Sequence, residues 1–138
     1  VTLSLVVLAS AVGAIWRLGQ GRIRQTSTDI SPALLSPGHW LTLLQVSSPL
    51  CSYCGAMRGI LSAAAARFEG VAHVEYDISE IPQVIEALEV RQTPTTFLVA
   101  ADGRVIHQVG GAAAPRVIDE LIEQAKSDVS KRSNEYTI

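Results

Sequence analysis

The fold is decided by the stretch from Trp40 to Phe68, which reads WLTLLQVSSPLCSYCGAMRGILSAAAARF. Its first part, residues 40–46, is a mostly apolar run that predicts a buried strand. Its last part, from Cys54 to Phe68, predicts a helix, because it contains a run of alanines and an apolar face. Two cysteines separated by two residues therefore lie between a buried strand and the start of a helix.

This context gives the Cys51-Ser-Tyr-Cys54 spacing a chemical meaning. The two sulfur atoms can approach to bonding distance, and the unpaired N–H groups at the helix start favour thiolate over thiol. We expect Cys51 to have a lowered pKa and to act as the nucleophile, and Cys54 to be more buried and to act as the resolving thiol. The predicted reaction is thiol–disulfide exchange through a mixed disulfide between Cys51 and the substrate.

Two alternatives exist for these cysteines, namely a structural pair of thiols and half of a zinc site. The chain has only two cysteines, and its three histidines, at positions 39, 73 and 107, form no His-x-His pair. The cysteines cannot supply a four-thiolate site, and the histidines lie far apart in sequence. We therefore expect neither a metal nor a cofactor.

Further strands and helices are expected on the C-terminal side of this stretch. The pattern predicts strands at 71–77, 95–100 and 104–109, and helices at 79–90 and 115–126. A helical crossover joins two strands in parallel, whereas the short Asp102-Gly103 turn makes the last pair antiparallel. The order β-α-β-α-β-β-α thus predicts an α/β fold with a mixed four-stranded sheet and helices on both faces.

The N-terminal segment explains a mean hydropathy of +0.27, which is high for a soluble domain. Residues 1–16 read VTLSLVVLASAVGAIW and carry no charge. We predict that residues 1–18 form a single membrane-anchoring helix, with a cleaved signal peptide or a buried core helix as alternatives. Basic residues follow this segment at Arg17, Arg22 and Arg24. By the positive-inside rule they predict a single-pass membrane protein whose remaining chain is cytoplasmic.

The remaining chain is expected to comprise a linker at 19–38, a domain at 39–126 and a polar C-terminal tail at 127–138. A total of 138 residues suits one packed domain. The net charge of −2 argues against nucleic acid as a partner, because phosphate binding needs a basic patch. An apolar content of 48% argues against wholesale disorder.

The chain from about residue 40 to residue 126 resembles the thioredoxin family. Four features match in order and spacing: the Cys-x-x-Cys after a strand, the VAHVEYD strand, the Thr93-Pro94-Thr95 motif, and the Asp-Gly hairpin followed by Val109-Gly110. The resemblance implies a thioredoxin-like fold, here preceded by an apolar helix. It also implies a protein-disulfide reductase whose partners are disulfide-containing proteins and an electron-donating reductase.

The resemblance also implies roles for residues outside the cysteine pair. Pro94 would be cis and face the two cysteines, and the backbone of Thr93 would pair with an extended substrate segment. Tyr53 and Gly110 are further candidate substrate-binding residues. The family's buried acid and its lysine partner align with Gln45 and His73, which become candidates for a proton relay. Since neutral Gln45 cannot accept a proton, either water or His73 would do so.

The chain departs from the common thioredoxin pattern beside the cysteines. Leu50 stands where many thioredoxins have tryptophan, and Ser52 and Tyr53 stand where they have glycine and proline. Glutaredoxin is the nearest rival family, because Ser-Tyr and a Gly-Gly pair occur there too. Against it, the hairpin has two full strands and no acidic residue directly follows the Gly-Gly pair at 110–111. The alternative functions are an extracytoplasmic protein of the cytochrome-maturation type and a non-catalytic binding module.

Overall fold

The computed structural model describes residues 1–18, 23–24 and 29–135. Within these residues one sheet contains the four expected strands, β2 (Leu41–Ser47), β3 (Val71–Asp77), β4 (Thr95–Ala100) and β5 (Val105–Gly110). Strand β2 pairs in parallel with β3 and antiparallel with β4, and β4 pairs antiparallel with β5. The mixed four-stranded sheet of a thioredoxin-like fold is thus confirmed.

A fifth strand, β1 (Ile23–Arg24), extends this sheet beyond the prediction. It pairs antiparallel with β5, so that the strand order is β1-β5-β4-β2-β3. The segment lies inside the expected linker. Two residues are too few to show an alternating pattern, which is why the sequence did not predict this strand.

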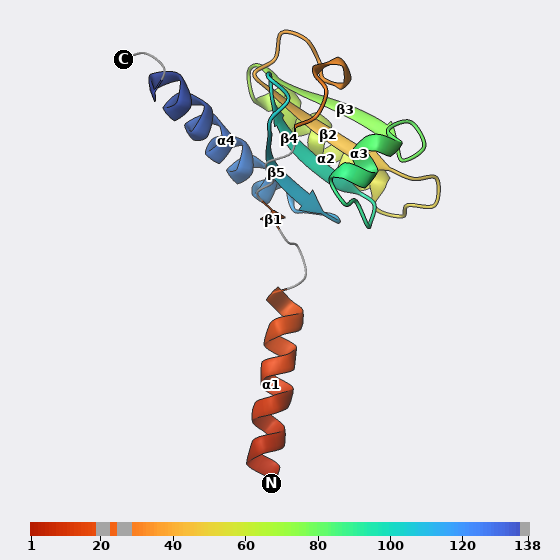
Figure 1. Ribbon diagram of the computed structural model, residues 1–138, viewed down its shortest axis with the longest axis vertical. Coiled ribbons are helices and arrows are strands. Elements are labelled where there is room, and N and C mark those ends of the chain that lie inside the picture. Colours follow the sequence, from red (N-terminus) through yellow and green to blue (C-terminus); the bar gives the residue numbers. More distant parts are fainter. Residues whose placement is uncertain (19–22, 25–28, 136–138) are drawn as a thin grey trace.

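Helices cover both faces of the sheet (Figure 1). Helices α2 (Cys54–Arg67) and α4 (Pro115–Glu135) pack on one face, where Leu41 and Leu43 of β2 point. Helix α3 (Pro82–Ala87) and the short 3₁₀ helix η1 (Pro32–Leu34) lie on the other face, where Leu44 and Val46 point. The alternation of side chains along β2 therefore builds two separate cores.

The domain begins earlier than expected, because the last part of the predicted 19–38 linker packs on the sheet. Ile30 is buried in the second core, and its N–H donates to the carbonyl of Gly103 at 2.7 Å. The Tyr76 hydroxyl donates to the carbonyl of Leu34 at 2.7 Å. The burial of Ile30 and these two hydrogen bonds make the segment from Asp29 onward part of the domain. Residues 19–22 and 25–28 of the linker lie outside the described residues.

Two helices differ in length from the prediction. Helix α4 continues to Glu135 instead of ending near residue 126, because Val129 extends its apolar stripe and no glycine or proline interrupts it. The expected tail is therefore helical as far as the structure describes it; residues 136–138 lie outside. Helix α3 is shorter than 79–90, because Ser79 bonds Asp77 instead of capping it and Glu89 has a φ of 52°.

Residues Thr2–Leu18 form helix α1, which lies apart from the domain in Figure 1. The side chains of residues 1–14 are exposed. In the part of the chain that the structure describes, no helix has the combination of length and apolar character that crossing a membrane requires. Membrane attachment through residues 1–18 therefore stays a prediction.

Candidate active site

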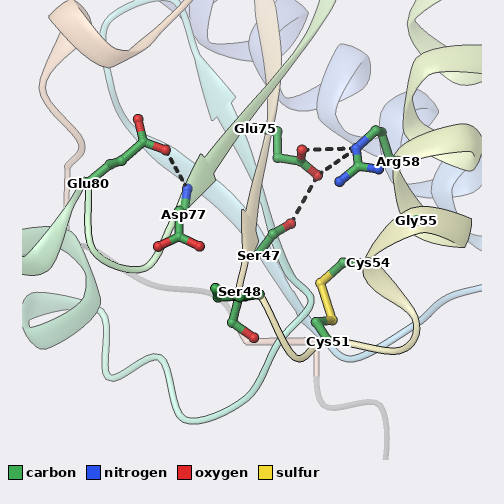
Figure 2. Close-up of a pocket in the computed structure, with 10 residues that line it drawn as sticks. Ser47, Ser48, Cys51, Cys54, Gly55, Arg58, Glu75, Asp77 and Glu80 are labelled. Atoms are coloured by element: carbon green, nitrogen blue, oxygen red, sulfur yellow. Dashed lines mark hydrogen bonds and ion pairs between the residues drawn. A yellow bond between two sulfur atoms is a disulfide. The ribbon is translucent and has the colours of Figure 1, made fainter.

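A disulfide joins Cys51 and Cys54 between the end of β2 and the start of α2 (Figure 2). The Cα atoms of the two cysteines are 5.5 Å apart. Cys54 is only 3% exposed, whereas Cys51 is partly exposed and lies between the exposed side chains of Leu50 and Tyr53. A substrate sulfur can therefore reach Cys51 more easily than Cys54. This difference suits the predicted roles of Cys51 as the nucleophile and Cys54 as the resolving thiol.

The loop before β4 contains a cis peptide bond between Thr93 and Pro94, as the resemblance implied. Pro94 is buried, and Thr93 is partly exposed. The Oγ of Ser48, three residues before Cys51, lies 2.9 Å from the Oγ1 of Thr93. This hydrogen bond connects the loop that leads to the cysteines with the loop of the cis proline.

Gly110 lies beside the cis-proline loop. It is paired with Thr95 across β4 and β5, and the N–H of the next residue, Gly111, donates to the carbonyl of Pro94 at 2.8 Å. A Cβ atom at Gly110 would lie 2.5 Å from the Nε2 of Gln92, which is closer than real Cβ atoms approach. A side chain at Gly110 would therefore have to displace the end of the Gln92 side chain.

The two candidate relay residues, Gln45 and His73, are hydrogen-bonded to each other. The side-chain amide nitrogen of Gln45 donates to the Cys54 carbonyl at 3.0 Å and to the Ser47 Oγ at 3.2 Å. The side-chain oxygen of Gln45 lies 3.0 Å from the Nε2 of His73, and the Ser62 Oγ lies 3.0 Å from the Nδ1. Gln45 thus contacts the backbone of Cys54, and His73 is connected to Cys54 only through Gln45.

The hydrogen bonds of His73 fix the role of one ring nitrogen. Because the Gln45 oxygen can only accept, the Nε2 of His73 must donate. The Nδ1 lies against the Ser62 hydroxyl, which can donate or accept, so these bonds suit both the neutral and the protonated ring. Burial lowers the pKa of His73, as does the charge of Arg58, while Glu75 opposes the effect. The lowered pKa favours the neutral ring.

A polar pocket of about 440 Å³ opens beside the disulfide (Figure 2). It is lined by Ser47, Ser48, Pro49, Cys51, Cys54, Gly55, Arg58, Glu75, Asp77 and Glu80. The Glu75 carboxylate accepts from the Ser47 hydroxyl at 3.0 Å and from the Nε of Arg58 at 2.9 and 3.0 Å. Hydrogen bonds from the hydroxyl and N–H of Ser79 lower the pKa of Asp77.

The sequence did not indicate that Glu75 belongs to the site. The position of Glu75 at the site follows from the pairing of β2 with β3, which brings Gln45 opposite Glu75 and Ser47 opposite Asp77. Because side chains alternate along a strand, Gln45, Ser47 and Glu75 share the face that carries α2. That relation depends on the register of two strands almost thirty residues apart, so it is visible only in the fold.

A second pocket, of about 260 Å³, lies on the other side of Ser48 and is largely apolar. It is lined by Ser48, Ile78, Ile85, Val90, Arg91, Gln92 and Thr93. Since Thr93 precedes the cis proline, this pocket adjoins the segment that the resemblance assigns to substrate binding. The described residues contain no group of three His, Cys, Asp or Glu side chains that could hold a metal ion.

Comparison with known proteins agrees with this geometry. The sequence model of the family described as Thioredoxin matches residues 27–124. Thioredoxin-2 of Pyricularia oryzae is 30% identical over 89 residues, covering 64% of this chain and 50% of that protein. The human thioredoxin domain-containing protein 8 is 24% identical over 74 residues, covering 54% and 58%. The chain thus spans about half the length of the curated relatives it matches.

Solved structures share the fold. A mutant thioredoxin from Halobacterium salinarum superposes with a TM-score of 0.55 at 24% identity, covering 62% of this chain and 74% of that one. Oxidised mitochondrial thioredoxin 3 from Saccharomyces cerevisiae gives 0.54 at 24% identity, covering 62% and 79%. Because the family match extends over most of the chain and includes both cysteines and the cis proline, this protein belongs to the thioredoxin family.

Proposed function

We propose that this protein is a thiol–disulfide oxidoreductase that reduces protein disulfides through its Cys51–Cys54 pair. The observation that carries the proposal is the unequal exposure of the two sulfur-bearing residues. Cys54 is 3% exposed and Cys51 is partly exposed beside a polar pocket. Thiol–disulfide exchange requires that a substrate reach one sulfur while the second waits behind it.

The proposed reaction has two exchange steps. In the first, the Cys51 thiolate attacks one sulfur of the substrate disulfide, and the other substrate sulfur leaves as a thiolate. In the second, Cys54 attacks Cys51, which releases the reduced substrate and leaves the Cys51–Cys54 disulfide. Two electrons pass from the protein dithiol to the substrate, so a separate dithiol reductase must restore the protein.

Substrate binding is assigned to the surface around Cys51. The backbone of Thr93 is free of the β4–β5 pairing, which begins at Thr95, and is proposed to pair with an extended substrate segment. Pro94 and Gly110 hold this loop in place through the contact of Gly111 with the Pro94 carbonyl. Tyr53 is 65% exposed beside Cys51 and is proposed to contact the substrate.

The reduction of insulin by dithiothreitol, followed as turbidity, tests this proposal. We expect the full chain to accelerate the reaction and the Cys51→Ser variant to fall to the uncatalysed rate. The reduced Cys54→Ser variant, mixed with insulin after dithiothreitol has been removed, should form a covalent adduct with insulin. Dithiothreitol should dissolve that adduct. If the wild-type chain does not exceed the uncatalysed rate, the proposal is wrong and a non-catalytic binding module becomes the better interpretation.

We also infer that α1 attaches the domain to a membrane, with the domain on the cytoplasmic side. The inference is supported by the uncharged sequence of residues 1–16, by the exposure of the side chains of residues 1–14, and by the arginines that follow. An extracytoplasmic domain is the alternative. An introduced surface cysteine, Ser127→Cys, in a chain lacking Cys51 and Cys54 should resist a membrane-impermeant maleimide on intact cells, and rapid labelling would reverse the orientation.

A further inference from the structure

Resolution of the mixed disulfide needs a group that takes the proton from Cys54, because the thiolate is the attacking species. Bulk water has little access to Cys54, which is 3% exposed. The neutral amide of Gln45 cannot accept a proton. His73 donates its Nε2 hydrogen to Gln45 and turns its Nδ1 toward Ser62 on the outer side. Neither of the two expected relay residues therefore presents a free base to the thiol.

Glu75 is the carboxylate with a connected route to Cys54. Both residues line the 440 Å³ pocket, and Figure 2 shows Ser47 between the Glu75 carboxylate and the disulfide. The Ser47 hydroxyl donates to Glu75 at 3.0 Å and accepts from the Gln45 amide at 3.2 Å. The same amide donates to the Cys54 carbonyl at 3.0 Å. Gln45, Ser47 and Glu75 thus form one hydrogen-bonded group that ends at the backbone carbonyl of Cys54, and Cys54 lines the same pocket as Glu75.

The other carboxylates of the pocket are engaged in the turn after β3. Asp77 accepts from the hydroxyl and the N–H of Ser79 at 2.6 and 3.0 Å. Glu80 accepts from the N–H of Asp77 at 2.9 Å. Glu75 is instead held by α2, through Arg58, and by β2, through Ser47. Its side chain is 27% exposed, so the carboxylate borders the pocket.

We infer that Glu75 accepts the proton of Cys54 during resolution, across the polar pocket that both residues line. The inference rests on the proposed function. The proton passes from the Cys54 thiol to the Glu75 carboxylate, and the Cys54 thiolate forms a bond to the Cys51 sulfur. The bond between Cys51 and the substrate sulfur breaks, and that sulfur leaves with the electron pair. The substrate thiolate then takes up the proton.

The experiment separates the two exchange steps in a single turnover. Fully reduced chain is mixed with the aromatic disulfide 5,5′-dithiobis(2-nitrobenzoate), and the released nitrothiobenzoate is followed by stopped-flow absorbance. The attack of Cys51 gives a first phase whose rate depends on reagent concentration. The attack of Cys54 on the mixed disulfide gives a second phase whose rate does not.

The Glu75→Gln variant should slow the second phase about 10²- to 10⁴-fold near neutral pH, the range expected for loss of a general base. Its second-phase rate should then rise tenfold per pH unit, because hydroxide replaces the carboxylate. The first phase should change by less than about twofold. Glu75→Asp, which keeps the carboxylate, should recover part of the second-phase rate.

The matched control is Asp119→Asn, which removes the carboxylate of an exposed ion pair with Arg67 outside the pocket. It should leave both phases and their pH profiles unchanged. The charged or titratable groups around Glu75 are Arg58, His73, Cys51, Cys54, Asp77 and Glu80. The pH profiles of the second-phase rate in the variants are therefore compared with the wild-type profile rather than fitted to the pKa of a single group.

An unchanged second phase in Glu75→Gln at every pH would overturn the inference. So would slowing of both phases to the same extent, since that would indicate a general structural effect. A wild-type chain that lacks the concentration-independent phase would instead contradict the proposed function, so the two failures are distinguishable.

Discussion

The hydroxyl groups of Ser48 and Thr93 are the direct link between the two loops that form the site, at an Oγ–Oγ1 distance of 2.9 Å. One such hydrogen bond contributes about 0.5–1.5 kcal/mol, which corresponds to roughly 2- to 12-fold in an equilibrium or rate. We expect Thr93→Val to lower kcat/KM for insulin reduction within this range, because the loop of the cis proline is held less firmly.

A double-mutant cycle checks whether this effect comes from the hydrogen bond. Ser48→Ala should lower kcat/KM similarly, and the double variant should lose little more than either single variant. Additive losses in kcat/KM would mean that the two hydroxyls act separately. Thermal unfolding of the same three variants shows whether the loops also couple in stability.

His107 predicts a pH dependence of stability. It is 5% exposed, and neither ring nitrogen has a hydrogen-bond partner within the described part of the chain. Burial lowers the pKa of His107 below 6.5, with Asp128 opposing the effect. As the pH falls, the His107 side chain is therefore protonated in the unfolded chain before it is protonated in the folded chain. The contribution to stability is complete above pH 6.5 and decreases as the pH falls through the lowered folded-state value.

We therefore expect the melting temperature to fall between pH 7.5 and pH 5.5, and to fall less in His107→Phe. The matched control is His39→Gln in the loop before β2, where the ring contacts Ser36 and the Pro37 carbonyl. An identical pH dependence in wild type and His107→Phe would contradict this assignment.

At the scale of elements, α2 carries both the resolving cysteine and the packing that holds it. Leu61 lies two turns after Cys54 and is fully buried in the core between the sheet and α4. Leu61→Ala should lower the free energy of unfolding by about 2–5 kcal/mol, because it removes buried surface and leaves a cavity. Denaturant unfolding measures this value.

The matched control for that prediction is Leu50→Ala. The Leu50 side chain is 96% exposed, so its loss should change the free energy of unfolding by less than about 0.5 kcal/mol. If both variants lose stability equally, the effect does not come from burial.

The sequence predicted the elements whose pattern is long enough to be periodic. Strands β3 and β4 have the expected bounds, and the others differ by a residue. The misses among the strands and the domain boundary are β1, which has two residues, and the segment after Asp29, where serines, prolines and a glycine break any periodic pattern around the buried Ile30. Local pattern cannot show that apolar side chains in such a segment cover a core built by distant strands.

The residues of the candidate site also divide into those that the sequence predicted and those that only the pairing of distant strands brings to the site. Cys51 and Cys54 were predictable, because their chemistry depends on a short motif and on the element that follows it, whereas the cis bond at Pro94 was predicted from the resemblance to the thioredoxin family. Gln45 and His73 were predicted as a pair and are hydrogen-bonded. Glu75 was missed, because its place beside Ser47 is set by the pairing of β2 with β3.

At the scale of the whole molecule, the apolar surface of α1 is the feature that the domain does not use. The exposed residues of α1 include Leu3, Leu5, Val6, Val7 and Leu8, and in Figure 1 the helix lies away from the sheet. If residues 1–18 attach the chain to a membrane, the full chain should float with vesicles of phosphatidylethanolamine and phosphatidylglycerol in a density gradient.

Replacing Val6 and Val7 together by aspartate should abolish this flotation, because each aspartate costs about 2.5–3.5 kcal/mol at the centre of an apolar helix in lipid. The matched control places two aspartates at Ser127 and Ser130, which are exposed on α4. The control should float like wild type, and both variants should reduce insulin at the wild-type rate, since neither change touches the cysteines. A wild-type chain that stays at the bottom of the gradient would contradict membrane attachment through α1 without affecting the proposed chemistry of Cys51 and Cys54.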